Sequence, residues 1–178
     1  MRIISGIHKG RKIILPRNLL VRPTTDMSKE SLMNILNFKY EISSIKIIDL
    51  FSGSGNLSYE FFSRGCKEVT AVEINKKCVE FIKTKSNELK LNLKVLKKDV
   101  FTFLKNTKFN YDIIFADPPY SFNMNDYEKL ISVIFKKSIL NKGGCLVIEH
   151  SKKISLKDQQ NFYESRNYGG CSMTFFYF

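Results

Sequence analysis

The sequence lacks the features of a membrane or secreted protein. No stretch of its 178 residues approaches the roughly 20 apolar residues that a membrane-spanning helix needs. The N-terminal run MRIISGIHKGRK mixes charges into its apolar residues, unlike a secretory signal. We therefore expect a protein of the cytoplasm with no membrane partner, and its length favours one compact unit.

Candidate metal ligands are also scarce. The cysteines are widely spaced without a C-x-x-C pair, and only two histidines accompany them. Such a set is unlike a zinc site or a disulfide framework, so we expect no metal. Most of the four cysteines are expected to be small buried apolar residues: Cys66, Cys78, Cys145 and Cys171.

Acidic residues are too few to balance the basic ones. Lys and Arg number 29 against 17 Asp and Glu, a net charge of +12. This excess suits a polyanionic partner, although solvated lysines in a lysine-rich composition would give the same number. Residues 1–24, here called the basic arm, contain no acid and no aromatic residue. We expect the arm to bind phosphates rather than stack on bases, through Arg2, Lys9, Arg11, Lys12, Arg22 and Thr24.

From residue 45 onward, apolar segments alternate with amphipathic ones. Strands are predicted at 45–51, 68–73, 93–96, 111–116 and 144–150, and helices at 56–64, 75–89, 100–104 and 126–137. Two final strands, 162–168 and 171–178, meet at a Gly169-Gly170 hairpin turn. This alternation predicts an α/β fold, with a mostly parallel sheet and helices on both of its faces.

The residues before this region predict a short extension. Two apolar runs around Lys9-Gly10 predict a hairpin within 2–14, and Asp26 is expected to cap a helix that ends near Phe38. We therefore expect a hairpin and helix over 1–40 and the main domain over 41–178, packed together as one unit.

A turn with two glycines follows the first strand of the main domain. Gly53 allows the sharp turn, and Gly55 would let a ligand approach the backbone closely. Ser58 stands where a third glycine would complete a dinucleotide fingerprint, which argues against a pyrophosphate on the following helix. The sequence also contains no G-x-x-x-x-G-K-[ST] motif, which excludes a P-loop site.

Two acids follow the next two strands. Glu73 ends the second strand, where a carboxylate can accept both ribose hydroxyls of an adenosine, and Asp99 follows the third. Alone, each feature has an ordinary explanation as a turn, a solvated acid or a helix cap. Together they are typical of an adenosine cofactor site, because ligands of such sheets bind at the carboxyl ends of the strands.

The fourth strand ends in Asp117-Pro118-Pro119-Tyr120. An exocyclic amino group is a poor nucleophile because its lone pair is delocalised into the ring. The Asp117 carboxylate and the Pro118 carbonyl can accept its two N–H bonds and favour a tetrahedral nitrogen that faces a methyl donor. The prolines hold these acceptors in place, and Tyr120 can stack on the base. The alternative is a rigid proline turn in which Asp117 is a local cap.

These motifs resemble those of known enzymes. DLFSGSGNLSYE at 49–60, the Glu73 strand and DPPY resemble class I methyltransferases. The N-terminal run and RPTTDMSKESLMNIL at 22–36 resemble the RsmD family, bacterial enzymes that methylate N2 of a guanine in 16S rRNA. The likeness runs nearly end to end and includes Val147-Ile148-Glu149-His150 and Tyr168-Gly169-Gly170.

The resemblance implies a Rossmann-like fold with seven strands, the last one reversed. It also implies S-adenosylmethionine as cofactor and ribosomal RNA or the small ribosomal subunit as partner. We expect the protein to be a monomer. DPPY would face a guanine that lies in a loop or is flipped out, and 22–26 would lie near the site. The residues expected to bind the cofactor are Asp49, Phe51, Gly53, Gly55, Glu73, Ile74 and Asp99.

Three alternatives stay open. DPPY serves DNA adenine-N6 methylation equally well, although 178 residues leave little room for a target-recognition segment. A glutamine-amide methyltransferase would share the fold, and the basic arm weighs against it. A basic RNA-binding assembly factor without turnover is the third, and the intact DPPY and glycine turn weigh against that.

Overall fold

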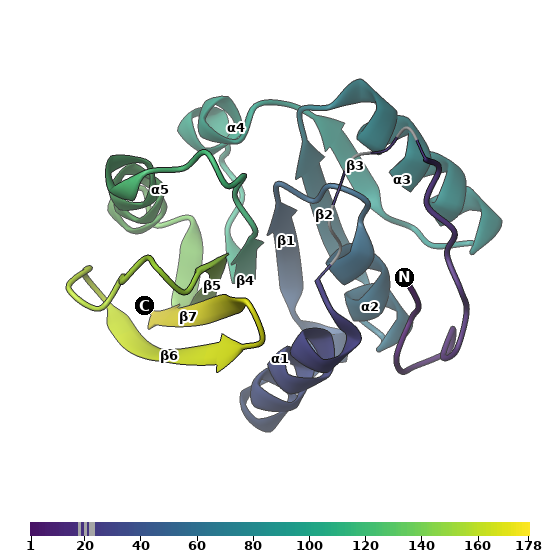
Figure 1. The fold of residues 1–178 in the computed structure, drawn as a ribbon, viewed down its shortest axis with the longest axis horizontal. Coiled ribbons are helices and arrows are strands. Elements are labelled where there is room, and N and C mark those ends of the chain that lie inside the picture. The colour runs from purple at the N-terminus through teal and green to yellow at the C-terminus, as the bar shows by residue number, and fades with distance from the viewer. Residues whose placement is uncertain (18, 20, 22–23) are drawn as a thin grey trace.

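A seven-stranded sheet organises the computed structural model, which describes residues 1–17, 19, 21 and 24–178. The strand order is β3-β2-β1-β4-β5-β7-β6 (Figure 1). Strands β1 to β5 run parallel, whereas β7 is antiparallel to both of its neighbours, β5 and β6. The predicted sheet with its reversed last strand is therefore confirmed. Its strands are β1 (Lys46–Leu50), β2 (Glu68–Glu73), β3 (Lys94–Lys97), β4 (Tyr111–Ala116), β5 (Leu140–Ser151), β6 (Phe162–Tyr168) and β7 (Cys171–Tyr177).

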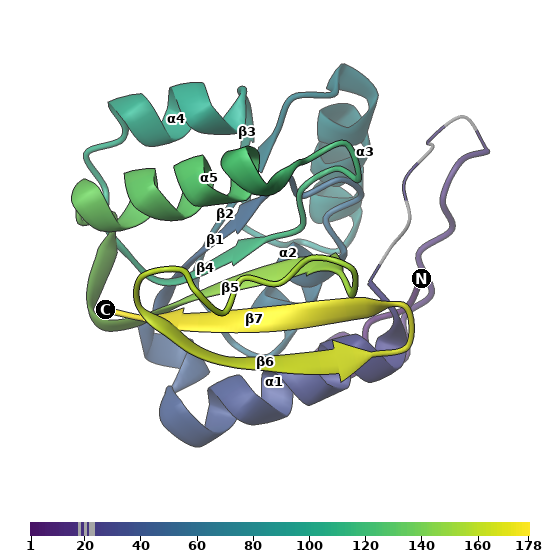
Figure 2. The same ribbon diagram turned by 60° about the vertical axis from the view of Figure 1, so that its left-hand side comes forward.

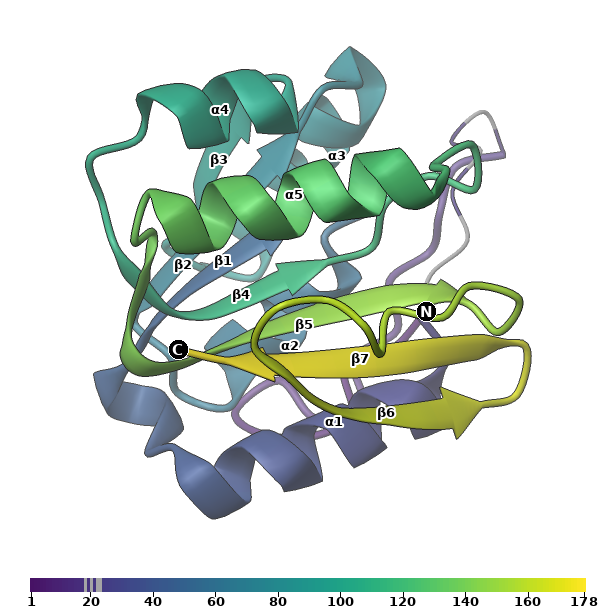
Figure 3. The same ribbon diagram turned by 90° about the vertical axis from the view of Figure 1, so that its left-hand side faces the viewer.

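Helices cover both faces of this sheet. They are α1 (Asp26–Lys39), α2 (Asn56–Ser63), α3 (Lys76–Glu88), α4 (Val100–Asn106) and α5 (Met124–Lys136), with a 3-10 turn at Ile42–Ser44. In Figure 3, α4 and α5 lie above the sheet, and α1 and α2 lie below it. Consecutive residues of β1 point to opposite faces of the sheet. Ile47 packs in the apolar cluster that includes α1, and Ile48 packs in the cluster that includes α5. None of the helices in the described ranges is long and apolar enough to cross a membrane.

The strand order reverses at β1. This strand pairs with β2 on one side and with β4 on the other, so successive crossovers leave it in opposite directions. A crevice forms at such a point beyond the carboxyl ends of the strands. The backbone N–H of Asp117, the first residue after β4, donates to the carbonyl of Leu50 at the end of β1, at 3.4 Å. The predicted motifs therefore meet at one edge of the sheet.

The two N-terminal runs pair with each other, as the predicted hairpin requires. They form an antiparallel bridge between Arg2 and Lys12, flanked by backbone hydrogen bonds between Met1 and Ile13 and between Ile3 and Arg11. Beyond this pair, the backbone N–H groups of Ile4 and Ser5 donate to the Glu60 carboxylate of α2, at 2.8 and 3.1 Å. The tip of the hairpin therefore follows α2, which satisfies its backbone groups.

The start of α1 differs by one residue from its prediction. Thr25 is the N-cap, and its side chain accepts the N–H of Ser28 at 3.2 Å. Asp26 is instead the first helical residue, where its carboxylate complements the helix dipole and pairs with Arg2 at 2.6 Å. Helix α5 likewise begins two residues before its predicted start, because Asn123 and Asp126 form a reciprocal capping box.

A buried ion cluster fastens the arm to α1 and α2. The side chain of Lys29 is fully buried, and its Nζ donates to the carbonyl of Arg2 and to Oδ1 of Asn56. It lies 3.6 Å from the Glu60 carboxylate, which also accepts from Arg64 at 2.8 Å. Burial lowers the pKa of Lys29, and the Glu60 carboxylate opposes that shift.

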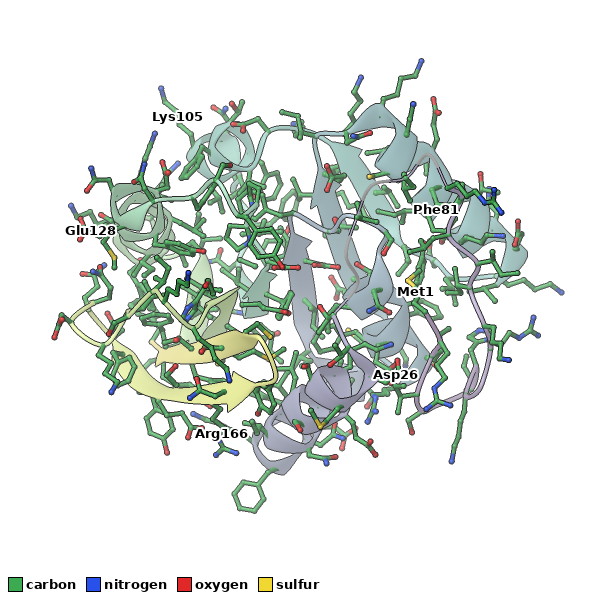
Figure 4. All side chains as sticks on the ribbon, viewed as in Figure 1. Met1, Asp26, Phe81, Lys105, Glu128 and Arg166 are labelled. Atoms are coloured by element: carbon green, nitrogen blue, oxygen red, sulfur yellow. The ribbon has the colours of Figure 1, made fainter. Side chains whose placement is uncertain are left out.

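The arm also packs against α3. Ile3 and Ile13 lie in one apolar cluster with Phe81 and Ile82 of α3, and Met1 packs against this cluster. Figure 4 shows Met1 and Phe81 on the same side of the molecule, away from Lys105 on α4. The described part of the arm is therefore a fixed layer of the fold.

Gly6 makes the closest contact between the arm and α2. Its φ is +83°, and an added Cβ would lie 1.7 Å from the Ser63 carbonyl oxygen. We expect Gly6→Ala to lower the free energy of unfolding by about 1–3 kcal/mol, because the arm must shift off α2. Gly10→Ala is the matched control, since Gly10 has a φ of +80° and no atom near its Cβ. Urea denaturation measures both, and equal losses would contradict the contact-based explanation.

Candidate active site

The carboxyl edge of the sheet contains a cavity of about 530 Å³. This volume lies in the range of small-molecule sites, roughly 300–1,000 Å³. Its walls come from the glycine turn after β1, the tip of β2, the DPPY segment after β4, and the start of α1. In Figure 2, the turn between β6 and β7 lies on the same side of the sheet as the arm, and both reach this cavity. Motifs predicted separately therefore share one space.

The glycine turn and Glu73 hold each other in place. Phe51 and Gly53 adopt left-handed φ values of 58° and 53°. The N–H of Gly53 donates to one carboxylate oxygen of Glu73, and the N–H of Asn75 donates to the other, both at 2.8 Å. Each oxygen keeps a second lone pair, so the carboxylate can still accept a ligand hydroxyl.

Two predicted cofactor residues lie outside the cavity. Gly55 does not line it, and the structure gives this glycine another role. Its φ is +78°, and an added Cβ would lie 3.0 Å from both Tyr59 and Ile82. Asp99 is exposed and caps α4 by accepting the N–H of Thr102 at 2.8 Å. The cavity does bring together the other five predicted residues: Asp49, Phe51, Gly53, Glu73 and Ile74.

Asp49 lies buried at the base of the glycine turn. Its Oδ2 accepts both the N–H and the hydroxyl of Ser58, at 3.2 and 2.6 Å. Burial raises the pKa of Asp49 to about 7, and these hydrogen bonds only partly oppose the shift. Ser58, noted in the sequence only as a missing glycine, is therefore the partner that satisfies this carboxyl group.

The DPPY segment separates two neighbouring cavities. A second one, of about 220 Å³, shares Asp117, Pro118 and Tyr120 with the first. It extends toward aromatic and polar residues of α5 and β5, including Tyr127 and His150. Pro118 is buried, whereas the Tyr120 side chain is 79% exposed at the mouth. Glu149 and Cys171 also line both cavities, so the arrangement can hold two ligands next to each other along this segment.

The predicted phosphate-binding residues divide into two groups. Lys9, Arg11 and Lys12 are exposed on the arm. Arg2 is exposed as well but pairs with Asp26. Thr24 is buried at the larger cavity, where its hydroxyl donates to Glu149 at 3.0 Å. Arg22 lies outside the described residues.

Several site residues were absent from the sequence-based prediction. Asn56 lines the larger cavity, where its amide donates to the Thr24 carbonyl at 2.9 Å and accepts from Lys29 at 3.0 Å. Lys29 could have been found, because it lies on the helical face of Leu32, Met33 and Leu36, three, four and seven residues later. A lysine on an apolar face needs a buried acceptor, which Glu60 supplies.

The cysteines are structural in character. Cys66, Cys78 and Cys145 are buried and Cys171 is half-buried, and all four are free thiols. The prediction of mostly buried apolar cysteines is confirmed. Over the ranges that the structure describes, no three His, Cys, Asp or Glu side chains are grouped so that they could hold a metal ion.

The sheet order and the glycine turn define a Rossmann-like methyltransferase fold of class I. The chain belongs to the family described as Conserved hypothetical protein 95, which matches residues 1–177, and so to the RsmD family that the motifs resemble. A relative from Buchnera aphidicola (subsp. Acyrthosiphon pisum), named ribosomal RNA small subunit methyltransferase D, is 36% identical over 162 residues, 90% of this chain and 83% of that one.

Solved structures agree on the fold. A hypothetical protein of Thermus thermophilus superposes with a TM-score of 0.87 at 24% identity, covering 100% of this chain and 99% of that one. The T. thermophilus 16S rRNA N2 G1207 methyltransferase, in complex with AdoMet and guanosine, gives a TM-score of 0.69 at 17% identity, covering 89% and 44%. At these sequence identities, the two comparisons show that the folds are similar.

Asp49 makes the stability of the protein depend on pH. Its pKa is about 7 in the folded chain and near 4 in an unfolded one. Between these values the unfolded chain releases a proton that the folded chain keeps. The free energy of unfolding should therefore fall as pH rises from about 4 to about 7, by up to about 4 kcal/mol, and be constant above that.

Asp49→Asn should remove this dependence. In urea denaturation between pH 4 and pH 8, the variant should gain stability relative to the parent as pH rises toward 7. Parallel pH profiles for the two proteins would show that Asp49 does not titrate in this range.

Proposed function

We propose that this chain transfers a methyl group from S-adenosylmethionine to the exocyclic N2 of a guanine in 16S ribosomal RNA. The observation that carries the proposal is the position of DPPY between two cavities, the larger of which also contains Glu73 and the glycine turn. An enzyme that transfers a group between two ligands needs two adjoining binding sites. It also needs fixed hydrogen-bond acceptors where the two sites meet.

The larger cavity fits the cofactor in size and in chemistry. Glu73 would bind the ribose hydroxyls, and Phe51 and Ile74 provide apolar surface for the adenine. The backbone at Gly53 can approach the ligand without a side chain in the way. When bound, S-adenosylmethionine supplies an electrophilic methyl group on a positively charged sulfonium.

DPPY would prepare the nucleophile from the other side. The Asp117 carboxylate and the Pro118 carbonyl accept the two N–H bonds of the amino group, which directs the nitrogen lone pair toward the methyl group. The nitrogen gains the methyl as the sulfur–carbon bond breaks, and the proton that the nitrogen then loses can pass to Asp117. Alignment at about 3–3.5 Å supplies most of the acceleration, so neither a metal nor a covalent intermediate is needed.

Ribosomal RNA is the substrate that the charge and the relatives support. Lys9, Arg11 and Lys12 are exposed on the arm, where they can contact phosphates. The relatives' name specifies small-subunit ribosomal RNA. The exposed Tyr120 can stack on a base that has left its helix. We propose that the protein acts as a monomer in the cytoplasm.

Asp117→Ala should abolish most methyl transfer. Losing a preorganised acceptor should lower kcat by about 10²–10³-fold, whereas calorimetry should find the S-adenosylmethionine affinity unchanged. The assay follows labelled methyl transfer to small-subunit RNA from a strain lacking the protein. Asp158→Ala, at an exposed position outside both cavities, is the control.

The methylated nucleoside decides among the candidate functions. We expect N2-methylguanosine from the RNA and no product from DNA. N6-methyladenosine from DNA would replace the proposal with the adenine alternative, and RNA binding without any transfer would favour the assembly factor.

Charge reversal on the arm should weaken RNA binding. Arg11→Glu with Lys12→Glu should cost roughly tenfold or more in affinity and make the dependence of log K on log salt shallower by about 2. Lys105→Glu with Lys136→Glu changes the net charge equally on α4 and α5, on the other side of the molecule (Figures 1 and 4), and should leave the slope nearly unaltered. Identical slopes for the two double variants would exclude the arm as an RNA contact.

A further inference from the structure

We propose that Glu149 selects guanine by accepting the N1–H of the target base while Asp117 accepts an N–H of its N2 amino group. This inference rests on the proposed function and assigns a specificity-determining residue to the same site. The Glu149-His150 segment, for which the sequence predicted no role, thereby receives one.

Strand pairing sets the two carboxylates side by side. In the parallel register of β4 and β5, Phe115 pairs with Val147 and Ala116 with Ile148. Asp117 and Glu149 directly follow this last pair, at the carboxyl edge of the sheet. Because neighbouring strands lie about 5 Å apart, both side chains can reach one site, and the charges of both act on Cys171. Both residues line both cavities.

The Glu149 carboxylate is oriented by the residues around it. Glu149 is only 9% exposed, and its Oε2 accepts the Thr24 hydroxyl at 3.0 Å. The Cys171 thiol, which donates to the Tyr168 carbonyl at 3.3 Å, lies beside it. Burial, followed by the charge of Glu149, raises the pKa of Cys171 to about 12, so this thiol stays neutral beside the carboxylate. A carboxylate held in this way can discriminate between ligands, because its fixed orientation determines where a ligand donor must lie.

The other polar groups of the smaller cavity are compatible with an anionic Glu149. His150 contacts the Thr174 hydroxyl at 2.7 Å and the Ser151 carbonyl at 2.9 Å, and burial lowers its pKa, which favours the neutral ring. Lys153 also lines this cavity and contributes a positive charge. The cavity thus contains a cation that can balance the neighbouring carboxylates.

The edge of the base determines which purine is accepted. In guanine, the N2 amino group lies between N1–H, a donor, and N3, an acceptor. In adenine, the N6 amino group lies between two acceptors, N1 and N7. A carboxylate beside the reacting amino group is therefore satisfied by guanine N1–H and repelled by either flank of adenine. Two adjacent carboxylates match the N1–H and N2–H donors of guanine and orient N1 toward β5.

Nucleoside binding tests this assignment without an RNA substrate. With S-adenosylhomocysteine bound, NMR titration compares guanosine, 1-methylguanosine, which lacks N1–H, and 3-deazaguanosine, which lacks N3. We expect the parent protein to bind guanosine roughly tenfold or more tightly than 1-methylguanosine, because the methyl group replaces the donor that faces Glu149, and to bind 3-deazaguanosine like guanosine. This comparison needs no variant.

Glu149→Gln then assigns the effect to one residue. The amide should reduce the preference for guanosine over 1-methylguanosine severalfold, because an uncharged acceptor binds the N1–H donor more weakly than a carboxylate does. Glu128→Gln, on the outer surface of α5 (Figure 4), should keep the parent preference. Thermal unfolding checks that both variants fold.

Two results would overturn the inference. One is a parent protein that binds 1-methylguanosine as well as guanosine or discriminates against 3-deazaguanosine instead. The other is a folded Glu149→Gln variant that keeps the full preference. If the parent protein still forms N2-methylguanosine in RNA, the proposed function stands and only the role of Glu149 is lost.

Discussion

The parallel pairing of β1 with β2 and β4 is the constraint on which the rest of the site depends. Because the three strands run in one direction and are buried on both faces, the groups that follow them are delivered to one edge of the sheet. Glu73, the glycine turn and Asp117 therefore meet although they are distant in the sequence. The hydrogen bond from the Asp117 N–H to the Leu50 carbonyl at the end of β1 holds the DPPY segment next to the glycine turn.

The N-terminal arm belongs to this site as much as the sheet does. Its fixed part is bound through buried charges on α1 and α2, where Lys29 and Glu60 compensate each other away from water. Isolated burial of either charge would cost several kcal/mol, so the pair is stable only when the arm supplies its backbone groups. From this anchored layer Thr24 reaches Glu149. The segment that contains the exposed basic residues thus also forms one wall of the larger cavity.

The sequence predicted the sheet and the main site motifs because their signals are local. Buried parallel strands are continuous apolar runs, and Gly53, Glu73 and Asp117-Pro118 indicate their chemistry through residue type and position after a strand. The errors and omissions depend on distant partners. Thr24 and Glu149 are separated by 125 residues, and Glu60 is 56 residues from Ile4, whose backbone N–H donates to it. Thr25 and Asp26 are both residue types that cap helices well. In the structure Thr25 is the N-cap, and Asp26 forms the ion pair with Arg2.

Mass mapping of ribosomal RNA from cells lacking this protein tests the central claim most directly. The account predicts that one guanine of the small-subunit RNA loses its N2-methyl group, and that the wild-type gene restores this modification whereas an Asp117→Ala allele does not. An unchanged set of methylated guanines in the deletion strain would contradict the account, as would full restoration by the Asp117→Ala allele.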